Sequence, residues 1–363
     1  MTQELFDDLR EFADYAAANA QEKYLSIYLL VDPSHSENQS QIPAWHIYLK
    51  NAIADIEASL DSTQTKQWKN VRLSDTDPNK DWARIRKRLD KYLTSYRPEG
   101  KTLALFISPS SEYRFELPVQ LSNVHHFGKP HIQEFLWAVD EYEAHMVVLL
   151  AEDEARVLQI GLDRTATDAT VIADQHWLRR QRKAAHAANI ESRQDELSRR
   201  FIQSIAKDAN KYFLGHPDIE RVILGGDQRL ANAVLGAVHP SVQEKVIAVL
   251  SIPVEAPAHV IASRIRETAE QHEREYEDAL VAEVIGQAKA RGRGATGTVA
   301  VGRALDRSAV RLLALPYPAD EALEPMLLQA VRQGSQVEFL HGEASSRAAE
   351  AGGIIAQLYY AVN

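Results

Sequence analysis

One stretch of this sequence collects the side chains best suited to bind phosphate. Between His176 and Ile190 there is no carboxylate, and Arg or Lys occupies four positions. The cationic and titratable side chains of this basic cluster are those of His176, Arg179, Arg180, Arg182, Lys183 and His186. Such a cluster repels itself unless counter-ions screen it, and a phosphate backbone is the commonest biological counter-ion. The alternative is a solvated helix start, because Arg, Gln, Lys and Ala favour helix.

The chain as a whole is acidic, which makes the basic cluster more informative. Its 363 residues include 41 Lys and Arg against 51 Asp and Glu, a net charge of −10. A nucleic-acid contact would therefore depend on local basic patches and not on a global field. The length predicts roughly two or three domains. The hydrophobic content of 45% and charged content of 25% are those of an ordinary soluble globular chain.

Several classes of protein are excluded by what the sequence lacks. It has no cysteine, which rules out a disulfide framework, a thiolate zinc site and a cysteine nucleophile. No metal-binding motif replaces them, so we expect no metal and no cofactor. The first ten residues carry acids and no apolar segment, unlike a signal peptide. Because no apolar run approaches the roughly 18 residues of a membrane span, we expect a cytoplasmic protein without a membrane partner.

The first part of the chain is predicted to be a small α+β domain. After an N-terminal amphipathic helix, the expected elements are a strand at 24–31, helices at about 44–60 and 82–96, and strands at 102–108 and 112–117. The polar connection at 61–81 offers candidates for an RNA contact, because it combines charge with one stacking ring. They are Lys66, Trp68, Lys69 and Arg72.

The second part is predicted to be an α/β layer sandwich. Its expected elements are a helix at 132–142, strands at 145–151, 155–161 and 169–173, a long helix at about 193–213, a strand at 221–224, a helix at 229–238 and a strand at 247–252. One strand runs into Gly225-Gly226-Asp227. This pattern is neither GxGxxG nor GxxxxGKS, so we interpret it as a strand-to-helix turn capped by Asp227.

The last part is predicted to be an α/β/α sandwich. Its expected elements are a helix at about 256–291, a loop at 292–297, a helix at 298–306, a strand at 310–315, a helix at 319–333, a strand at 337–341, a glycine-rich turn and a strand at 354–360. We therefore expect three domains, with boundaries at 1–130, 131–255 and 256–363.

Four segments together resemble one known superfamily. They are the strand 24–32 with its two helices and the strand 102–108, the helix and strand of 193–226 ending in RVILGG, the segment 296–315, and the turn and strand of 352–360. Their order is similar to that of archaeo-eukaryotic release factors and Pelota, including their bacterial branch. The resemblance implies an α/β (α+β) chain of three small sandwich domains, the central one RNase H-like and the C-terminal one ribosomal-protein L7Ae/L30e-like.

Two motifs of the catalytic members of this superfamily are missing. In termination factors, the loop entering the long central helix carries Gly-Gly-Gln, whose glutamine helps water attack the peptidyl-tRNA ester. The corresponding segment here, 175–192, has no Gly-Gly-Gln, and the Asn-Ile-Lys-Ser motif of the first domain is also absent. The chain thus resembles members that occupy the ribosomal A site without hydrolysis, in particular Balon-like ribosome hibernation factors. We expect no catalytic residue.

The same resemblance implies the partners. It places the first domain at the decoding centre and the central domain at the peptidyl-transferase centre of the 70S ribosome. The basic cluster would then contact rRNA on the peptidyl-transferase side, and the side chains of 66–72 on the decoding side, so that 23S and 16S rRNA are both partners. It further implies binding to a translational GTPase such as elongation factor Tu.

Alternative functions remain open at this point. The chain could instead rescue stalled ribosomes, or hydrolyse peptidyl-tRNA with Gln175 or Gln181 orienting water. A third class is a metal-dependent nuclease or small-molecule enzyme that uses strand-end acids, namely Asp153, Asp163, Asp168 and Asp174.

Overall fold

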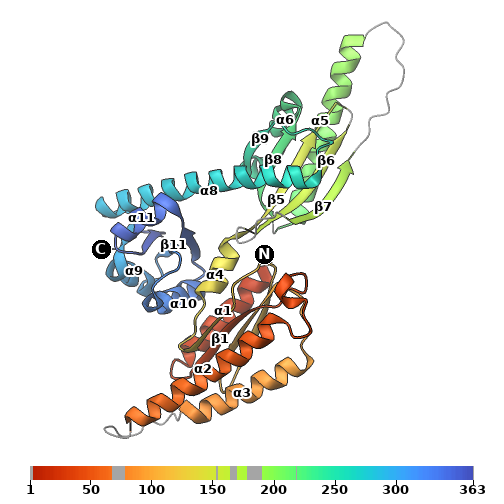
Figure 1. The fold of residues 1–363 in the computed structure, drawn as a ribbon. Coiled ribbons are helices and arrows are strands. Elements are labelled where there is room, and N and C mark those ends of the chain that lie inside the picture. The colour runs from red at the N-terminus through yellow and green to blue at the C-terminus, as the bar shows by residue number, and fades with distance from the viewer. Residues whose placement is uncertain are drawn as a thin grey trace. The chain divides into compact units, whose positions relative to one another are not determined.

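The computed structural model describes residues 3–67, 78–152, 154–163, 170–177, 190–217 and 219–362. The chain divides into two compact units. The central unit is Glu141–Tyr276, and the composite unit combines Glu4–Asp140 with Glu277–Asn363. Both units are mixed α/β, as predicted (Figure 1). The three-domain boundaries expected from the sequence remain a proposal.

The central unit is built on a five-stranded mixed sheet in the order β7-β6-β5-β8-β9. β5 (Tyr142–Leu150), β6 (Ala155–Asp163) and β7 (Thr170–Trp177) are antiparallel neighbours. β8 (Ile219–Gly226) runs parallel to β5, and β9 (Val246–Leu250) runs parallel to β8. The helices are α5 (Ile190–Gly215), α6 (Gln228–Leu235), the short α7 (Pro240–Gln243) and the first part of α8 (Ala258–Lys289).

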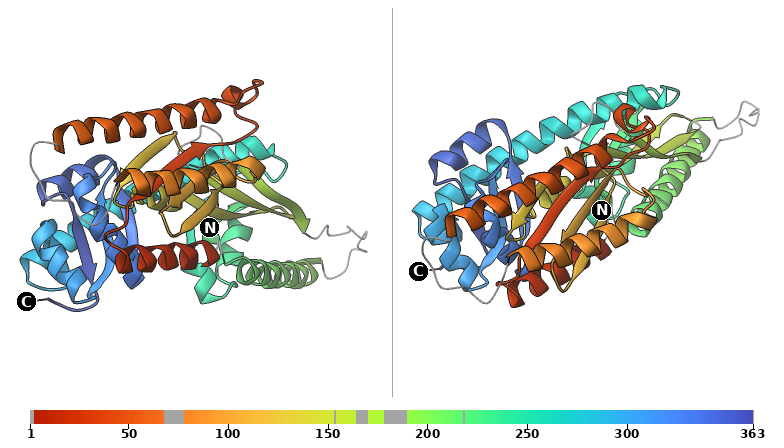
Figure 2. Two further views of the ribbon diagram at one scale, coloured as in Figure 1. Left: turned by 90° about the horizontal axis from the view of Figure 1, so that it is seen from below. Right: turned by 60° about the horizontal axis from the view of Figure 1, so that its bottom comes forward.

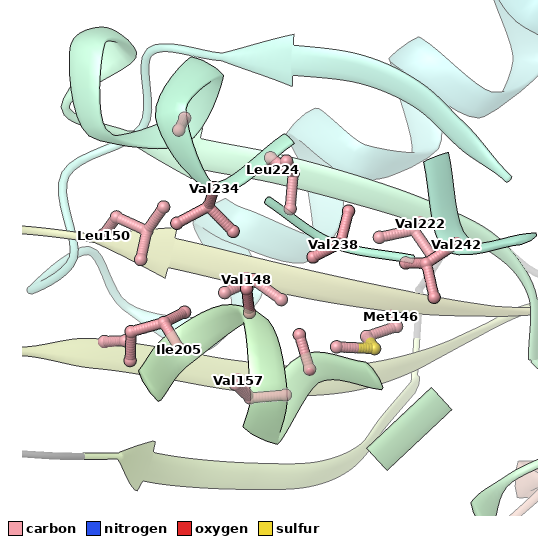
Figure 3. Close-up of a cluster of buried hydrophobic side chains, with 14 of the residues drawn as sticks. Met146, Val148, Leu150, Val157, Ile205, Val222, Leu224, Val234, Val238 and Val242 are labelled. Atoms are coloured by element: carbon pink, nitrogen blue, oxygen red, sulfur yellow. The ribbon is translucent and has the colours of Figure 1, made fainter. Parts of the chain in front are cut away.

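The central strand β5 is buried on both faces, as its continuous apolar run Met146–Leu150 requires. Met146, Val148 and Leu150 point to one core, shared with α5 and α6 (Figure 3). Val147 and Leu149 belong to the opposite core, which α8 covers. The period of two along a strand therefore distributes one apolar run between two helical layers.

The composite unit begins with a four-stranded antiparallel sheet in the order β3-β2-β1-β4. Its elements are α1 (Gln3–Ala18), β1 (Tyr24–Leu30), η1 (Ser36–Asn38), α2 (Ala44–Gln67), α3 (Pro78–Ser95), β2 (Thr102–Ile107), β3 (Glu112–Leu117), β4 (Val124–Gly128) and α4 (Gln133–Asp140). Leu25, Ile27 and Leu29 of β1 pack against α2 and α3, which lie on one face of the sheet (Figure 2). On the other face, Phe12 of α1 stacks on Phe106 with ring centroids 4.5 Å apart.

Two sequence predictions in this region are corrected. Edge strand β4 was not predicted, and α2 and α3 extend toward each other, so only 68–77 separates them. Helix α2 therefore contains Lys66, which was expected in a loop. The last two turns of α2 read DSTQTKQ and contain no apolar residue, so periodicity could not reveal them.

The C-terminal segment of the composite unit forms a second four-stranded sheet, in the order β10-β13-β11-β12. Its elements are β10 (Gly294–Thr296), α9 (Gly297–Asp306), β11 (Val310–Pro316), η2 (Glu321–Leu323), α10 (Glu324–Gln333), β12 (Gln336–Leu340), α11 (Gly342–Glu350) and β13 (Ile355–Leu358). β11 and β12 are parallel, and the other pairs are antiparallel. The loop predicted at 292–297 contains a strand, and the predicted glycine-rich turn contains helix α11, because helix formers lie between its flanking glycines.

Candidate nucleic-acid interface

Most residues of the two predicted rRNA-binding segments lie outside the described residues. These are Arg179, Arg180, Arg182, Lys183 and His186 of the basic cluster, and Trp68, Lys69 and Arg72 of the connection. For Lys66 and His176 the structure describes only the backbone. His176 lies in β7 opposite Arg156, which corrects its expected position in a loop, since this strand was predicted to end at Ala173. Both segments remain predictions.

The described residues contain a further basic surface, on helix α3. This helix, PNKDWARIRKRLDKYLTS, carries six cations and two acids in a chain of net charge −10. Its apolar positions Trp82, Ile85 and Leu89 are buried against α2 and the sheet. Because an α-helix turns through 3.6 residues, the side chains at 80, 84, 87 and 91 lie on the opposite side. We call Lys80, Arg84, Lys87 and Lys91, all exposed, the α3 stripe.

The α3 stripe contains no acid and is a row, not a compact cluster. Its ends are 11 residues apart, which corresponds to about 16 Å along the helix axis. Of the two acids of the helix, Asp90 is paired with Arg86 at 3.0 Å, beside the stripe. Within the part of the chain that the structure describes, Arg84, Lys87 and Lys91 form no ion pair. A row of exposed cations, three of them without an ion pair among the described residues, fits an extended polyanion.

The remaining arginines of α3 are used differently. Arg88 donates to the carbonyl oxygens of Pro109 and Ser110, at 3.2 Å each, and lies 3.7 Å from Glu112. Arg86 lies 3.5 Å from Glu57 of α2 in addition to its contact with Asp90. These two side chains attach the helix to its neighbours, whereas the α3 stripe is directed to solvent.

Sequence reasoning missed the α3 stripe although its signal is present. Cations at i, i+4, i+7 and i+11, with no acid among them, mark a basic helix face. The candidates for an RNA contact were instead placed in the long polar connection at 61–81. The stripe begins at the end of that connection. Together with Lys66, Lys69 and Arg72, the four stripe cations form one basic tract within 66–91.

A pocket of about 330 Å³ lies at the carboxyl ends of β5, β8 and β9 in the central unit. Acids line it, namely Glu152, Asp227 and Glu255, so it is unsuited to phosphate. Gly226 has φ of 90°, and a β-carbon there would collide with the backbone of Leu150. Asp227 caps α6 by accepting a hydrogen bond from the backbone N–H of Leu230 at 3.0 Å. The predicted strand-to-helix turn is confirmed.

The acids considered for a metal-dependent enzyme are not brought together in any described site. Asp153 and Asp168 lie outside the described residues, and for Asp163 and Asp174 only the backbone is described. Of the two glutamines considered for hydrolysis, Gln181 is outside and Gln175 lies in β7. Among the described residues, no helix is both long and apolar enough to cross a membrane.

Comparison with known proteins gives one family match. Residues 130–274 match the sequence model of bacterial archaeo-eukaryotic release factor family 10. No curated protein matches the chain.

Two solved structures illustrate what the chain is similar to. S. cerevisiae Dom34, a translation termination-like factor, is 12% identical over 69% of this chain and 73% of its own, with a TM-score of 0.45. Archaeoglobus fulgidus Pelota is 16% identical over 74% of this chain and 82% of its own, with a TM-score of 0.32. The family match covers most of the central unit and confirms the predicted superfamily. Over residues 130–274, which are less than half of the chain, the sequence is therefore similar to the bacterial archaeo-eukaryotic release factor family.

Proposed function

We propose that this protein is a non-catalytic ribosome-binding factor that occupies the A site of the 70S ribosome and protects idle ribosomes during hibernation. The observation that carries the proposal for this chain is the α3 stripe, an acid-free row of exposed cations on an otherwise acidic protein. The similarity of residues 130–274 to a bacterial release factor family supports a role in translation. The missing Gly-Gly-Gln motif supports binding without hydrolysis of peptidyl-tRNA.

Two basic surfaces would divide the contacts with rRNA. The tract at 66–91, which includes the α3 stripe, would bind 16S rRNA on the decoding side. The basic cluster at 176–186 would bind 23S rRNA on the peptidyl-transferase side, where arginines can contact phosphates in a bidentate manner. A translational GTPase such as elongation factor Tu is the proposed delivery partner. The net charge of −10 suits a protein that binds RNA only at a shaped site.

Neutralising the α3 stripe is the direct test. We expect Arg84→Gln, Lys87→Gln and Lys91→Gln together to weaken binding to vacant 70S ribosomes at least about tenfold, because up to three phosphate contacts are lost. Each lost contact should also reduce the slope of log affinity against log salt concentration by about one. The measurement is the bound fraction against protein concentration at several salt concentrations. The exchanged side chains are exposed, so we expect changes in the free energy of unfolding within about 0.5 kcal/mol.

A matched control separates this surface from overall charge. Arg264→Gln, Arg274→Gln and Lys289→Gln also remove three positive charges, in this case from exposed positions of α8. This triple variant should bind as the parent does. Equal weakening in both variants would indicate a nonspecific charge effect, and unchanged binding of the α3 variant would contradict the proposal for the stripe.

The basic cluster gives a second, independent prediction. Changing Arg179, Arg180, Arg182 and Lys183 to Ala should reduce ribosome binding, because up to four phosphate contacts are removed. A parallel assay measures release of labelled peptide from stalled ribosomes. We expect no release by the parent protein. Release that is lost in Gln181→Ala would instead support a peptidyl-tRNA hydrolase.

A further inference from the structure

Two histidines and three glutamates meet in the composite unit, at a place that sequence analysis did not single out. His126 lies in β4, His131 precedes α4, and Glu134 is in the first turn of α4. Glu321 and Glu324 come from η2 and the start of α10. His131, Glu134 and Glu324 are all more than nine-tenths buried.

The two imidazole rings point the same way. They are stacked with centroids 3.5 Å apart and an interplanar angle of 18°. Both Nδ1 atoms face the C-terminal glutamates: Nδ1 of His131 is 2.9 Å from Oε1 of Glu324, and Nδ1 of His126 is 3.7 Å from Oε1 of Glu321. Both Nε2 atoms face Glu134, at 3.0 Å for His131 and 3.9 Å for His126. One ligand atom from each of His126, His131 and Glu134 lies within 4.8 Å of the other two.

Gln133 determines which nitrogen of His131 can carry a hydrogen. Its Oε1 accepts a hydrogen bond from the backbone N–H of Ala319 at 2.9 Å, so its amide Nε2 is directed at His131. That amide lies 3.0 Å from Nε2 of His131 and can only donate. A lone pair on Nε2 and a hydrogen on Nδ1, donated to Glu324, satisfy both neighbours. The lone pair then also faces the carboxylate of Glu134, which is repulsive without a cation between them.

Two further observations favour binding of a cation between these side chains. Nε2 of His126 is buried and has no hydrogen-bond partner among the described residues. No Lys or Arg is paired with Glu134 or Glu324 in the described part of the chain. Glu324 also accepts hydrogen bonds from the backbone N–H groups of Ile132 and Gln133, at 2.9 and 3.2 Å, so the buried carboxylate that faces only histidines is that of Glu134.

We propose that His126, His131 and Glu134 bind one divalent transition-metal ion, with Zn²⁺ as the best match. Two imidazole Nε2 atoms and one carboxylate form a common zinc ligand set, in which each nitrogen lies about 2.0–2.1 Å from the metal. Metal-binding histidines typically donate their other N–H to a carboxylate. Glu324 is positioned to accept from Nδ1 of His131 at 2.9 Å, and Glu321 is the carboxylate next to Nδ1 of His126, at 3.7 Å. Binding requires the stacked rings to splay so that both lone pairs converge, and Nε2 of His131 must exchange its hydrogen bond from Gln133 for the metal. The site joins β4 and α4 to the C-terminal glutamates and goes beyond the proposed ribosome binding.

The test uses the full, tag-free chain. The protein is first treated with a chelator and then titrated with Zn²⁺ alone in a calorimeter. We expect one ion per chain. His126→Ala and Glu134→Gln should each weaken binding at least about tenfold, because each removes a ligand from a three-ligand site. Addition of Zn²⁺ should raise the melting temperature of the parent and not that of the variants. Co²⁺ bound in place of Zn²⁺ should give a d–d absorption spectrum that the variants lack.

His125→Ala is the matched control. This histidine is adjacent to His126 in β4, but its Nδ1 lies 2.9 Å from the hydroxyl of Tyr48. Its removal should leave zinc binding unchanged. If His126→Ala does not fold, Glu134→Gln alone decides the question, since it keeps the size of the side chain. Absence of zinc binding by the parent, or equal one-to-one binding by parent and folded variants, would overturn the proposal.

Discussion

Gly226→Ala is expected to destabilise the central unit by at least about 3 kcal/mol. Gly226 has φ of 90°, where an L-residue is strained, and a β-carbon would collide with the carbonyl oxygen of Leu150 in neighbouring strand β5. Relief would require β5 and β8 to move apart, although their register is fixed by the parallel pairing of Leu150 with Gly226. The measurement is the free energy of unfolding from urea denaturation, followed by circular dichroism.

Gly236→Ala is the control for this substitution. Gly236 ends α6 with φ of −70°, and an added β-carbon would have no neighbour closer than 3.7 Å. Its exchange should change the free energy of unfolding by less than about 1 kcal/mol, in the stabilising direction if the effect on the unfolded chain dominates. Equal midpoints for Gly226→Ala and the parent would mean that the turn is not held as described.

Phe106→Ala is expected to destabilise the composite unit by about 3–5 kcal/mol. Phe106 is fully buried, and its ring lies 4.5 Å from that of Phe12 and 5.9 Å from that of Tyr28. Its removal leaves a cavity between α1 and the sheet, which rigid neighbours can fill only in part. The measurement is again the free energy of unfolding.

The comparison variant is Phe6→Ala, in the same helix as Phe12. Phe6 is 38% exposed, so the same chemical change should cost less than about 1 kcal/mol. A small effect of Phe106→Ala, similar to that of Phe6→Ala, would contradict the description of this core.

Long, strongly patterned elements were predictable from the sequence. The run Met146–Leu150 and the stripe of Ile205 and Ala209 in α5 bury apolar side chains at the expected period, which is a signal that sequence alone carries. The cap of α6 was also predictable, because glycines favour a tight turn and Asp is a preferred residue at the start of a helix. The superfamily followed from the order of such elements, and the match over 130–274 confirms it.

The misses have a different physical origin. Strand β4 is short, reads VHHFG and has no fully buried residue, so neither alternation nor an apolar run marks it. The group of His126, His131 and Glu134 with Glu324 depends on a contact between His131 and Glu324, which are 193 positions apart in sequence, and no local pattern encodes it. The α3 stripe differs, because its spacing was present in the sequence and was overlooked beside a longer polar connection.

The α3 stripe lies directly opposite Trp82, Ile85 and Leu89, so the exposed charges and the packing of α3 depend on different sides of the helix. Exchange of one stripe cation leaves the packed side of α3 unchanged, because the side chain is exposed. The proposed contact with rRNA could therefore be weakened one charge at a time, while the buried side of the helix keeps its packing. Arg84, Lys87 and Lys91 are three positions at which such a change is expected to cost little in the free energy of folding, because their side chains are exposed.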